Sequence, residues 1–513
     1  MEPIKANQRL GLIAKRIIAL PPTAKECCLA EIGQLYGTEQ LELIHANIHQ
    51  EQYLQKLMSN PDKMPLSNAQ LVLWSIELTS GSSKNEVTSS FIEGALEQTK
   101  LEHAINDIIN ELDIFNFRVN NWLPFAKRLS RQKIKLVTYH TDPQHPIEPQ
   151  IDEINKNLAT IDLRQMKQNI YPCLIIIDEN KALLQFVVTH KSIDTKTKTL
   201  LWHILWHKYH NKEINTYAPY RDYIHSEKSY YANIERYLQQ HVENDYGQLS
   251  PCHIDINIID NDSLIKNRLL YSLDEAKVNE LKVFAHQHQY TLDELIISAT
   301  LKAFKSYSHN NEFIIQLISQ PLFYADVNET VGPCLNERFF GMKCDQDELL
   351  LITEKLSHSN RESLKFYNIL YGAGLGWLYY FKYKKIAPLI GSALRIITSS
   401  SRYMRLSKAG AECYAGLILY EFLANKNKEF PLLSFNFRNV FTGKTLSGAQ
   451  DELQFKPYLY PLYKKPTNYV SINIDTPEDN TLVIHLESYF KEEIDKKLMD
   501  ATLANLNHYL TLK

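Results

Sequence analysis

The stretch LLQFVVTHKSIDTKTKTLLWHILW, which runs from Leu183 to Trp206, decides the fold assignment. It begins with an apolar run, continues with polar residues from Thr189 to Thr195, and ends with leucine and tryptophan at helical spacing. β-Branched and aromatic runs favour strands, and apolar residues three or four positions apart favour an amphipathic helix. The pattern therefore predicts a buried strand, a polar loop and a helix, with His190 at the end of the strand.

Two interpretations fit a histidine at this position. At its ordinary pKa of about 6.5, a rigidly held imidazole can accept a proton from an amine or alcohol at neutral pH. Lys191 would disfavour the charged imidazolium if the two side chains approached each other. The spacing allows Asp194 either to contact the ring or to hold the loop. From spacing alone, a histidine that only completes a tight turn is the favoured interpretation of His190.

Strand and helix patterns alternate on both sides of this stretch. Residues 171–190 predict a hairpin around Asp178–Asn180, and residues 91–112 predict a helix. Thr291, with Glu294 three residues later, predicts a helix that begins with a capping box. Further strands are expected at residues 133–140, 311–319, 431–441, 468–476 and 481–489, and a closing helix at residues 491–510.

This alternation predicts two α/β lobes preceded by a helical extension. The extension comprises residues 1–60, with a break at Pro21–Pro22 and an N-cap at Thr23. Residues 61–245 form the N-terminal lobe, and residues 246–513 form the C-terminal lobe. The extension either docks a neighbouring enzyme or braces the first lobe, and bracing is the favoured interpretation.

Composition excludes several classes of protein. The chain has 513 residues, a net charge of −3 and a 44% hydrophobic content, which give no reason to expect a nucleic-acid partner. Its N-terminus lacks the apolar core of a signal peptide, and its longest apolar stretch, residues 369–381, is too short to span a membrane. The seven scattered cysteines form no CxxC pair, so that neither a disulfide framework nor a zinc site is expected. We expect a cytoplasmic protein.

The common cofactor and hydrolase motifs are absent from the sequence. It contains no Walker loop, GxGxxG, GxSxG or HExxH. His203 and His207 have a spacing that could bind a metal, but their predicted helix face is otherwise leucine and tryptophan, which favours packing. His286 and His288 are expected to be exposed near a helix end.

A basic segment lies in the second half of the chain. No acidic residue occurs between Glu362 and Glu412. The basic residues of this span are Lys365, Lys382, Lys384, Lys385, Arg395, Arg402, Arg405 and Lys408. They could dock an acidic protein, an anionic membrane surface or a phosphate-bearing carrier arm. A solvated helix face paired with acids elsewhere remains an equal alternative.

Four motifs, taken in order, resemble those of the condensation domains of nonribosomal peptide synthetases, within the chloramphenicol-acetyltransferase-like superfamily. SNAQLVLW resembles the family's opening motif, THKSIDT its central His-His-x-x-x-Asp-Gly motif, VGPCLNERF its Val-Gly-x-x-x-Asn segment, and LLSFNFRNVF the strand that bridges back to the other lobe. The matching residues are Ser67, Ala69, Gln70, Leu73, Trp74, His190, Asp194, Val331, Gly332, Asn336, Ser434, Phe435 and Asn436. The resemblance covers about residues 62 to 513.

The resemblance implies an α/β fold of two chloramphenicol-acetyltransferase-like lobes in a V shape, with a tunnel between them. It implies an acyltransferase that joins a carrier-bound acyl thioester to an amine or alcohol, forming an amide or an ester. His190 would position the nucleophile and accept its proton, or stabilise the tetrahedral intermediate, and Asp194 would hold the loop. The donor arm would be phosphopantetheine or CoA, with no metal or bound cofactor. The proposed carrier-docking residues are Lys382, Lys384, Lys385, Arg402 and Arg405.

The sequence departs from the family pattern at several positions. Thr189 replaces the first histidine of the central motif, and Thr195 replaces its glycine. Asn116 stands where the early motif has arginine, and residues 317–326 lack the arginine that usually pairs with the motif aspartate. Asp194 would then pair with Arg338, with Arg118 or with no arginine.

These departures leave two alternatives to an acyltransferase in nonribosomal peptide or related biosynthesis. The first is a non-catalytic domain that only docks carriers, as some members of the family only recruit partners. The second is a lipid acyltransferase that lies on an anionic membrane surface through residues 365–408.

Overall fold

The computed structural model describes most of the chain, in segments separated by gaps. The described residues are 12–80, 84–213, 217–230, 265–266, 269–308, 311–321, 324–363, 369–370, 373–399, 408–427, 433–438, 453–457, 463–464, 470–475, 481–488, 490 and 492–512. The predicted lobe boundary at residues 245–246 lies outside them.

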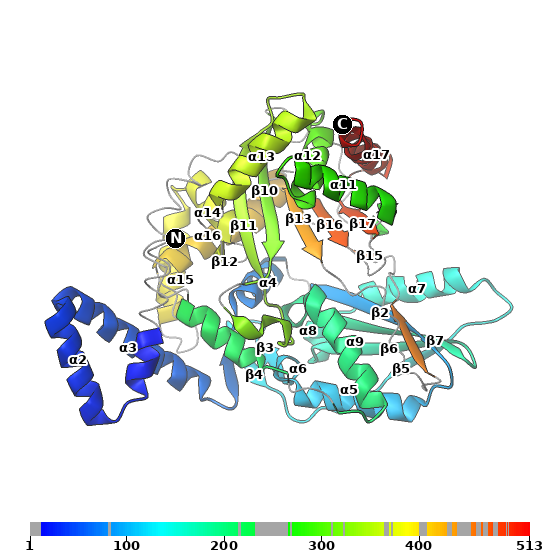
Figure 1. Cartoon of the computed structure of the whole chain (residues 1–513). Helices are drawn as coiled ribbons and strands as arrows, with labels where there is room; N and C mark the ends of the chain where they lie inside the picture. The colour runs from blue at the N-terminus through cyan, green and yellow to red at the C-terminus, as the bar shows by residue number, and fades with distance from the viewer. Residues whose placement is uncertain are drawn as a thin grey trace.

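A five-stranded sheet carries the central motif. Its strand order is β14–β2–β7–β6–β5, and every neighbouring pair is antiparallel except β5 and β6. The strands are β14 (Gln454–Pro457), β2 (Asn85–Glu93), β7 (Lys181–Thr189), β6 (Ile170–Asp178) and β5 (Val137–His140). The predicted hairpin is confirmed as β6 and β7, with β7 in the middle of the sheet (Figure 1).

Both faces of β7 are buried, which explains its continuous apolar run. Leu184, Phe186 and Val188 belong to a core shared with α5 and α9, whereas Leu183 and Val187 belong to a second core on the opposite face. The helices of the two cores are α5 (Gln98–Glu111), α9 (Thr195–Tyr209), α7 (Ile147–Ala159) and α8 (Leu163–Met166). The strand that ends at the central motif is therefore held from two sides.

A seven-stranded sheet forms most of the second half of the fold, in the order β12–β11–β10–β13–β16–β17–β9. β13 is parallel to both of its neighbours, and the other pairs are antiparallel. The strands are β12 (Ile369–Leu370), β11 (Asn336–Lys343), β10 (Glu312–Ser319), β13 (Leu433–Arg438), β16 (Val470–Asp475), β17 (Leu482–Glu487) and β9 (Leu269–Leu273). The strands expected at residues 311–319, 431–441, 468–476 and 481–489 are confirmed.

One face of this sheet packs against helices, and its other face carries a mixture of polar and apolar side chains. The apolar face forms a core with α11 (Glu275–Gln287), α12 (Leu292–Lys305), α13 (Leu349–Ser363) and α17 (Glu492–Tyr509), as Figure 1 shows. Ser434, Asn473 and Asp475 alternate with the core residues of β13 and β16 and so point to the other face. The predicted capping box of α12 is confirmed, because the Thr291 and Glu294 side chains bond each other's backbone amides.

The two sheets are joined by segments from the second half of the chain. β14 pairs with β2, and its Phe455 is buried in the core beneath the five-stranded sheet. α16 (Lys408–Asn427) packs against α4 (Asn68–Ser80) and places Tyr414 and Leu417 in that core. The interpretation of Ser434–Asn436 as the bridging strand is wrong, because β13 pairs with β10 and β16; β14 crosses between the sheets.

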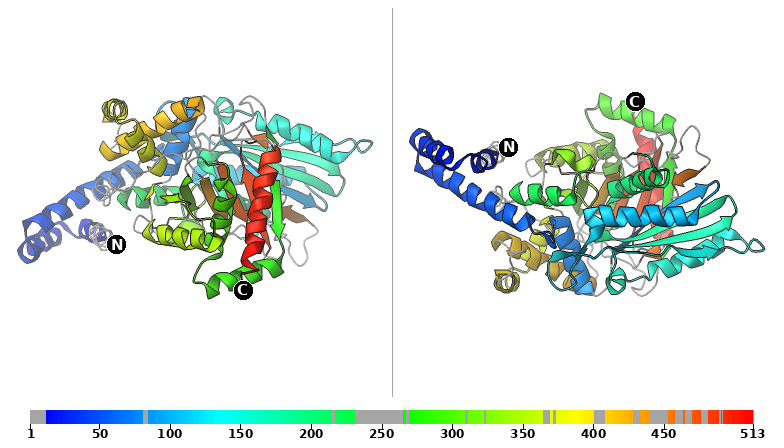
Figure 2. Two further views of the ribbon diagram at one scale, coloured as in Figure 1. Left: turned by 90° about the horizontal axis from the view of Figure 1, so that it is seen from above. Right: turned by 90° about the horizontal axis from the view of Figure 1, so that it is seen from below.

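The N-terminal segment is helical and projects from the body of the molecule, as Figures 1 and 2 show. α2 (Pro22–Tyr36) and α3 (Thr38–Met58) meet at Gly37. The expected N-cap at Thr23 is wrong, because Pro21 occupies the cap and Pro22 begins the helix, where the missing amide hydrogen costs nothing. The helix predicted over residues 91–112 begins only at Gln98, because residues 91–93 pair with β7.

The remaining described elements complete the fold. They are β1 (Lys63–Pro65), α6 (Asp113–Asn116), β3 (Phe117–Val119), β4 (Phe125–Arg128), the 3-10 helices η1 (His190–Ser192) and η2 (Ala325–Asn328), β8 (Ile265–Lys266), α14 (Ala373–Lys382), α15 (Ala387–Ser399) and β15 (Tyr463–Lys464). Among the described residues, no helix combines the length and the apolarity needed to cross a membrane. The tunnel between the lobes stays a prediction.

Phe455→Ala should lower the free energy of unfolding by about 3–5 kcal/mol, because it empties a fully buried site whose ring contacts Trp202. Chemical denaturation measures this loss. Lys456→Ala is the matched control in the same strand: its ammonium pairs with Glu93 at the surface, and removing such a pair costs about 0–1 kcal/mol. Equal losses for the two variants would show that β14 does not anchor the sheet.

Candidate functional site

His190 lies at the point where β7 ends and η1 begins. Its backbone amide donates to the Lys84 carbonyl (2.8 Å), and its Nδ1 lies 3.2 Å from the Ile193 carbonyl oxygen. A carbonyl oxygen can only accept, so that Nδ1 carries the proton in the neutral ring and Nε2 keeps its lone pair. The half-buried imidazole is therefore oriented to accept a proton at Nε2.

The opening motif holds this loop through the Gln70 side chain. Gln70 Nε2 donates to the Lys191 carbonyl (3.0 Å), and its Oε1 accepts the Ser67 amide (3.1 Å). Ser67 Oγ accepts the Gln70 amide (3.1 Å), which completes a reciprocal cap at the start of α4. The indole of Trp74 donates to the Asn120 carbonyl (2.9 Å). The structure thus brings Ser67 and Gln70 together with the central motif, although Gln70 and Lys191 are 121 positions apart in the sequence.

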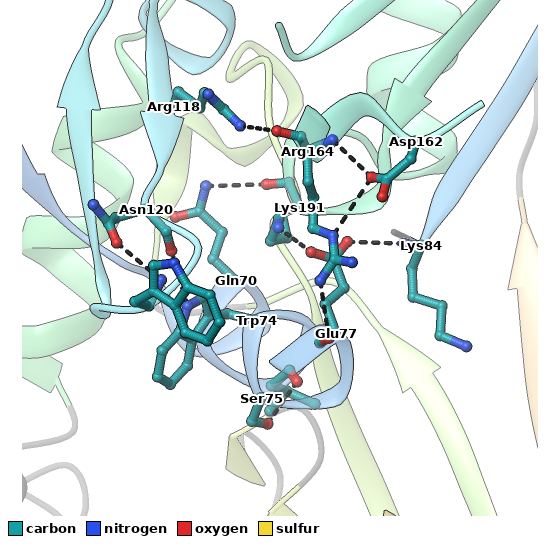
Figure 3. Close-up of polar contacts among 12 residues, drawn as sticks. Gln70, Trp74, Ser75, Glu77, Lys84, Arg118, Asn120, Asp162, Arg164 and Lys191 are labelled. Carbon is teal, nitrogen blue, oxygen red and sulfur yellow. Dashed lines mark hydrogen bonds and ion pairs between the residues drawn. The ribbon is translucent and has the colours of Figure 1, made fainter. Parts of the chain in front are cut away.

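Lys191 forms a buried ion pair with Glu77 of α4, as Figure 3 shows. The side chains of Lys191 and Glu77 are only 5% and 2% exposed. Glu77 Oε1 also accepts the Lys84 amide (2.8 Å), and its backbone carbonyl accepts from Arg164 (3.2 Å). Because Lys84 in turn bonds the His190 amide, Glu77 connects α4, the start of β2 and the histidine loop.

This arrangement corrects the expectation that Lys191 keeps the imidazole neutral. Its ammonium pairs with Glu77 in the interior rather than with the ring. Burial lowers the pKa of Lys191, and the Glu77 carboxylate acts in the opposite direction. The sequence hinted at this ion pair only through a charged residue among buried neighbours, since its partner lies 114 positions away.

Both carboxylate oxygens of Asp194 accept backbone amides. Oδ1 accepts the Thr197 amide (2.7 Å) and caps α9, while Oδ2 accepts the Cys334 amide (3.0 Å). Neither arginine considered as its partner contacts it: Arg118 donates to the Arg164 carbonyl and Arg338 donates to Asn360 (2.8 Å). Asp194 therefore joins the histidine loop to the segment that resembles Val-Gly-x-x-x-Asn.

The same segment makes further contacts with α9. The Thr197 hydroxyl accepts the Gly332 amide (2.9 Å) and donates to the Gly332 carbonyl (3.0 Å). Gly332 has a φ of +145°, and a Cβ there would lie 2.2 Å from the Tyr220 ring, so that only glycine fits. The Tyr220 hydroxyl lies 2.8 Å from Ser67 Oγ and 2.9 Å from the Pro333 carbonyl. These bonds connect three of the four motifs.

The structure also places four other predicted site residues. Thr189, in place of the first histidine, is buried, and its hydroxyl has no hydrogen-bond partner among the described residues. Thr195 begins α9 directly after Asp194. Asn336 is buried at the start of β11, and Ser434 is buried in β13 beside Gln316.

Only part of the proposed carrier-docking set can be placed. Lys382, Lys384 and Lys385 are exposed around the end of α14. Lys382 lies over the rings of Tyr379 and Tyr383, 5.5 Å and 5.6 Å from their centroids. Arg402 and Arg405 lie outside the described residues.

His203 is exposed rather than packed on the leucine and tryptophan face: its ring centroid lies 4.4 Å from that of His207, and its Nδ1 lies 3.3 Å from the Tyr217 hydroxyl. Burial, together with His207, lowers the pKa of His203. His286 and His288 are exposed, as expected. Within the described segments, no group of three or more histidine, cysteine or acidic residues could hold a metal ion.

Two polar centres escaped the sequence analysis. The Asp475 carboxylate accepts two hydrogen bonds from the Arg438 guanidinium, each 2.7 Å long. Its Oδ2 also lies 2.9 Å from His485 Nε2, on the face of the seven-stranded sheet opposite the helices. The pKa of Asp475 is lowered: burial opposes this shift, and His485 and Arg438 outweigh it. Glu227 accepts the Asn68 amide (2.8 Å) and the Tyr223 hydroxyl (3.0 Å) beneath the opening motif. No local pattern marks either centre.

The model of the Condensation domain family matches residues 60–369, which is more than half of the chain. No curated protein matches this chain. The X-domain from teicoplanin biosynthesis is a similar solved structure, with a TM-score of 0.65 and 11% identity over 88% of this chain and 96% of that chain. The epimerization domain from the third module of tyrocidine synthetase B has a TM-score of 0.61 and 14% identity over 88% and 97%. The first condensation domain of the CDA synthetase has a TM-score of 0.60 and 10% identity over 87% and 97%.

Glu77→Gln should lower the free energy of unfolding by about 3–5 kcal/mol, because it leaves the Lys191 ammonium buried without its partner. The glutamine keeps an oxygen for the Lys84 amide, so that the substitution isolates the loss of charge. Lys191→Met should cost a similar amount. The double variant should cost much less than the sum of the two single losses, because neither charge then remains buried. Additive losses in denaturant titrations would contradict the assignment.

Burial raises the pKa of Glu227 to about 7, whereas an unfolded glutamate titrates near ~4.3. Between these values the folded chain keeps a proton that the unfolded chain has lost. As the pH rises through this window, the free energy of unfolding should therefore fall by up to about 1.4 kcal/mol per pH unit because of Glu227. Glu227→Gln should remove that slope in denaturation series, while the control Glu280→Gln, on the surface of α11, should retain it. An unchanged slope in Glu227→Gln would refute the prediction.

Proposed function

Because the chain belongs to the condensation-domain family, we propose that it transfers an acyl group from a thioester to an amine or alcohol, with His190 as the base. The observation that carries this proposal is the Nδ1 contact with Ile193, which leaves Nε2 available as a proton acceptor. The fold likeness to condensation, epimerization and X-domains supports the family but not a particular reaction.

In the proposed reaction, the acceptor nitrogen or oxygen attacks the thioester carbonyl carbon. Nε2 of His190 takes the proton that the nucleophile loses as the new bond forms. The carbon–sulfur bond of the tetrahedral intermediate then breaks, the leaving sulfur takes the proton from Nε2 of His190, and an amide or ester remains with the histidine restored to its neutral form. General-base assistance of this kind contributes about 10²–10⁴-fold to a rate, and alignment of the two reactants contributes the rest.

The loop contacts suit this role, because a base must be held within hydrogen-bond reach of the proton it removes. Gln70 fixes the Lys191 carbonyl, Lys84 fixes the His190 amide, and Asp194 fixes the end of the loop on α9. In the proposed enzyme, Thr189 and Thr195 alter the wall of the site while the reactive histidine is retained.

We propose a phosphopantetheine arm on a carrier protein as the donor handle, with acyl-CoA as the alternative. In both, the acyl group is carried on a thioester, and the arm is a substrate rather than a resident cofactor. The family's association with nonribosomal peptide synthesis supports a carrier, because solved relatives include a four-domain nonribosomal peptide synthetase.

A non-catalytic docking domain is the second candidate. It is favoured by a solved relative, the X-domain in a complex with OxyB from teicoplanin biosynthesis, with a TM-score of 0.61 and 12% identity. The buried, unpartnered hydroxyl of Thr189 at the first histidine position also favours it. The orientation of the His190 ring, whose Nδ1 contacts the Ile193 carbonyl, favours the acyltransferase.

His190→Ala should lower the transfer rate by about 10²–10⁴-fold, because the proton acceptor is removed. Acyl-loaded carrier proteins and acyl-CoA are mixed with the protein and a pool of amines and alcohols, and intact-mass spectrometry follows the acyl group. His286→Ala is the matched control, since its ring is exposed far from the loop in sequence. It should leave the rate unchanged.

Two outcomes would contradict the proposed enzyme. Transfer at an equal rate in His190→Ala would remove the histidine from the chemistry. Binding of loaded carriers by both proteins without transfer would favour the docking domain. Thermal unfolding of each variant shows whether a loss of transfer comes from a loss of fold.

A further inference from the structure

The helix α15 has two apolar faces, of which only one is packed. Ala387, Gly391, Leu394 and Thr398 face α16, where Ala387 and Gly391 are buried. The opposite face carries three large aliphatic side chains in the open. They are Leu389 (71% exposed) and Ile396 (73%), together with Ile386 (52%), which immediately precedes the helix. With Ala393 between them, these residues form one stripe on the helix, because their spacing of three or four positions follows the helical repeat.

The stripe differs from the single exposed aliphatic residues of the protein's other helices. The outward face of a surface helix is normally polar, and single exposed aliphatic residues such as Val283 on α11 need no explanation. Several large aliphatic residues gathered on one face indicate an interaction site. Figures 1 and 2 place α15 at the edge of the molecule, on the outer side of α16.

Basic residues flank the stripe. Lys384 and Lys385 are exposed immediately before α15, and Arg395 is exposed beside Ile396. None of these three cations forms an ion pair with a carboxylate of the residues that the structure describes. Residues 363–411 contain no aspartate or glutamate, and the nearest acid along the chain, Glu412 of α16, lies beside Gly391 on the packed face of α15. Basic charge therefore lies next to the exposed aliphatic surface.

We propose that α15 binds the surface of an anionic phospholipid bilayer, lying in the plane of the membrane. The aliphatic stripe enters the boundary between headgroups and acyl chains, and Lys384, Lys385 and Arg395 contact lipid phosphates. The long basic side chains reach the headgroups while their methylene groups stay near the apolar layer. Because the packed face fixes α15 on α16, the stripe is presented by a rigid element.

A second copy of the chain fits this face less well than a membrane does. A two-fold interface would place Lys384 and Lys385 of one copy close to the same residues of the other, and like charges across an interface are unfavourable. An acidic protein, such as a carrier, would satisfy the lysines, but it would also have to present an apolar patch that matches the stripe. The bilayer satisfies both features with one chemistry.

The test is flotation of the full chain with vesicles of phosphatidylcholine, alone and mixed with phosphatidylglycerol. Binding is expected only to the mixed vesicles, and it should weaken as salt rises. Leu389→Gln with Ile396→Gln should weaken binding by about tenfold or more, because two aliphatic side chains no longer leave water. Lys384→Glu with Lys385→Glu should weaken it by about fivefold or more for each lysine.

Matched double variants elsewhere on the surface serve as controls. Val283→Gln with Leu351→Gln removes two exposed aliphatic residues from α11 and α13, and Lys496→Glu with Lys497→Glu reverses an adjacent pair of exposed lysines on α17. Both controls should bind like the wild type. These measurements need no acyl transfer, so their outcome is independent of the proposed reaction.

Three results would overturn the proposal. The first is no binding of the wild type to mixed vesicles at low salt. The second is an equal loss of binding in the control variants. The third is that the protein does not bind vesicles but forms a dimer, or binds a loaded carrier, and that Leu389→Gln with Ile396→Gln abolishes this association. The stripe would then be a protein interface.

Discussion

The carboxylate of Asp194 is the contact on which the geometry around His190 depends. One oxygen caps α9, and the other accepts the amide of Cys334 from the second half of the chain. Hydrogen bonds from amides to a carboxylate are strong, and a negative charge suits the N-terminus of a helix. Without the Asp194 carboxylate, the loop would lose its bonds to α9 and to Cys334, and the two bonds between Thr197 and Gly332 would remain to join α9 to the 331–334 segment.

A second device holds the beginning of the loop. Glu77 joins the Lys191 ammonium to the amide of Lys84, whose carbonyl accepts the His190 amide. The chain thus lacks the arginine that commonly accompanies the motif aspartate, yet both ends of the loop are fixed, one by backbone amides and one by a buried ion pair. With the loop held in this way, the Nδ1 of His190 contacts the Ile193 carbonyl and its Nε2 keeps a lone pair.

The proposed chemistry and the proposed membrane contact use different parts of one connected body. α16 contacts α4, which carries Gln70 and Glu77, and on its other side it supports α15. Binding at α15 would therefore be adjacent, through one helix, to the element that supports the histidine loop. An acyl donor or acceptor that partitions into a bilayer would suit such an arrangement, whereas a fully water-soluble pair would give it no advantage.

The sequence by itself determined the elements whose periodicity is strong, including the β6–β7 hairpin, the capping box at Thr291 and the strands β10, β13, β16 and β17 of the second sheet. It also placed His190 at the end of a buried strand, because that pattern is local. The tertiary structure alone decided the partner of Lys191, the binding of the Cys334 amide to Asp194 and the crossing of β14. Those contacts join residues more than a hundred positions apart, and no local spacing records which buried charge or edge strand meets which partner.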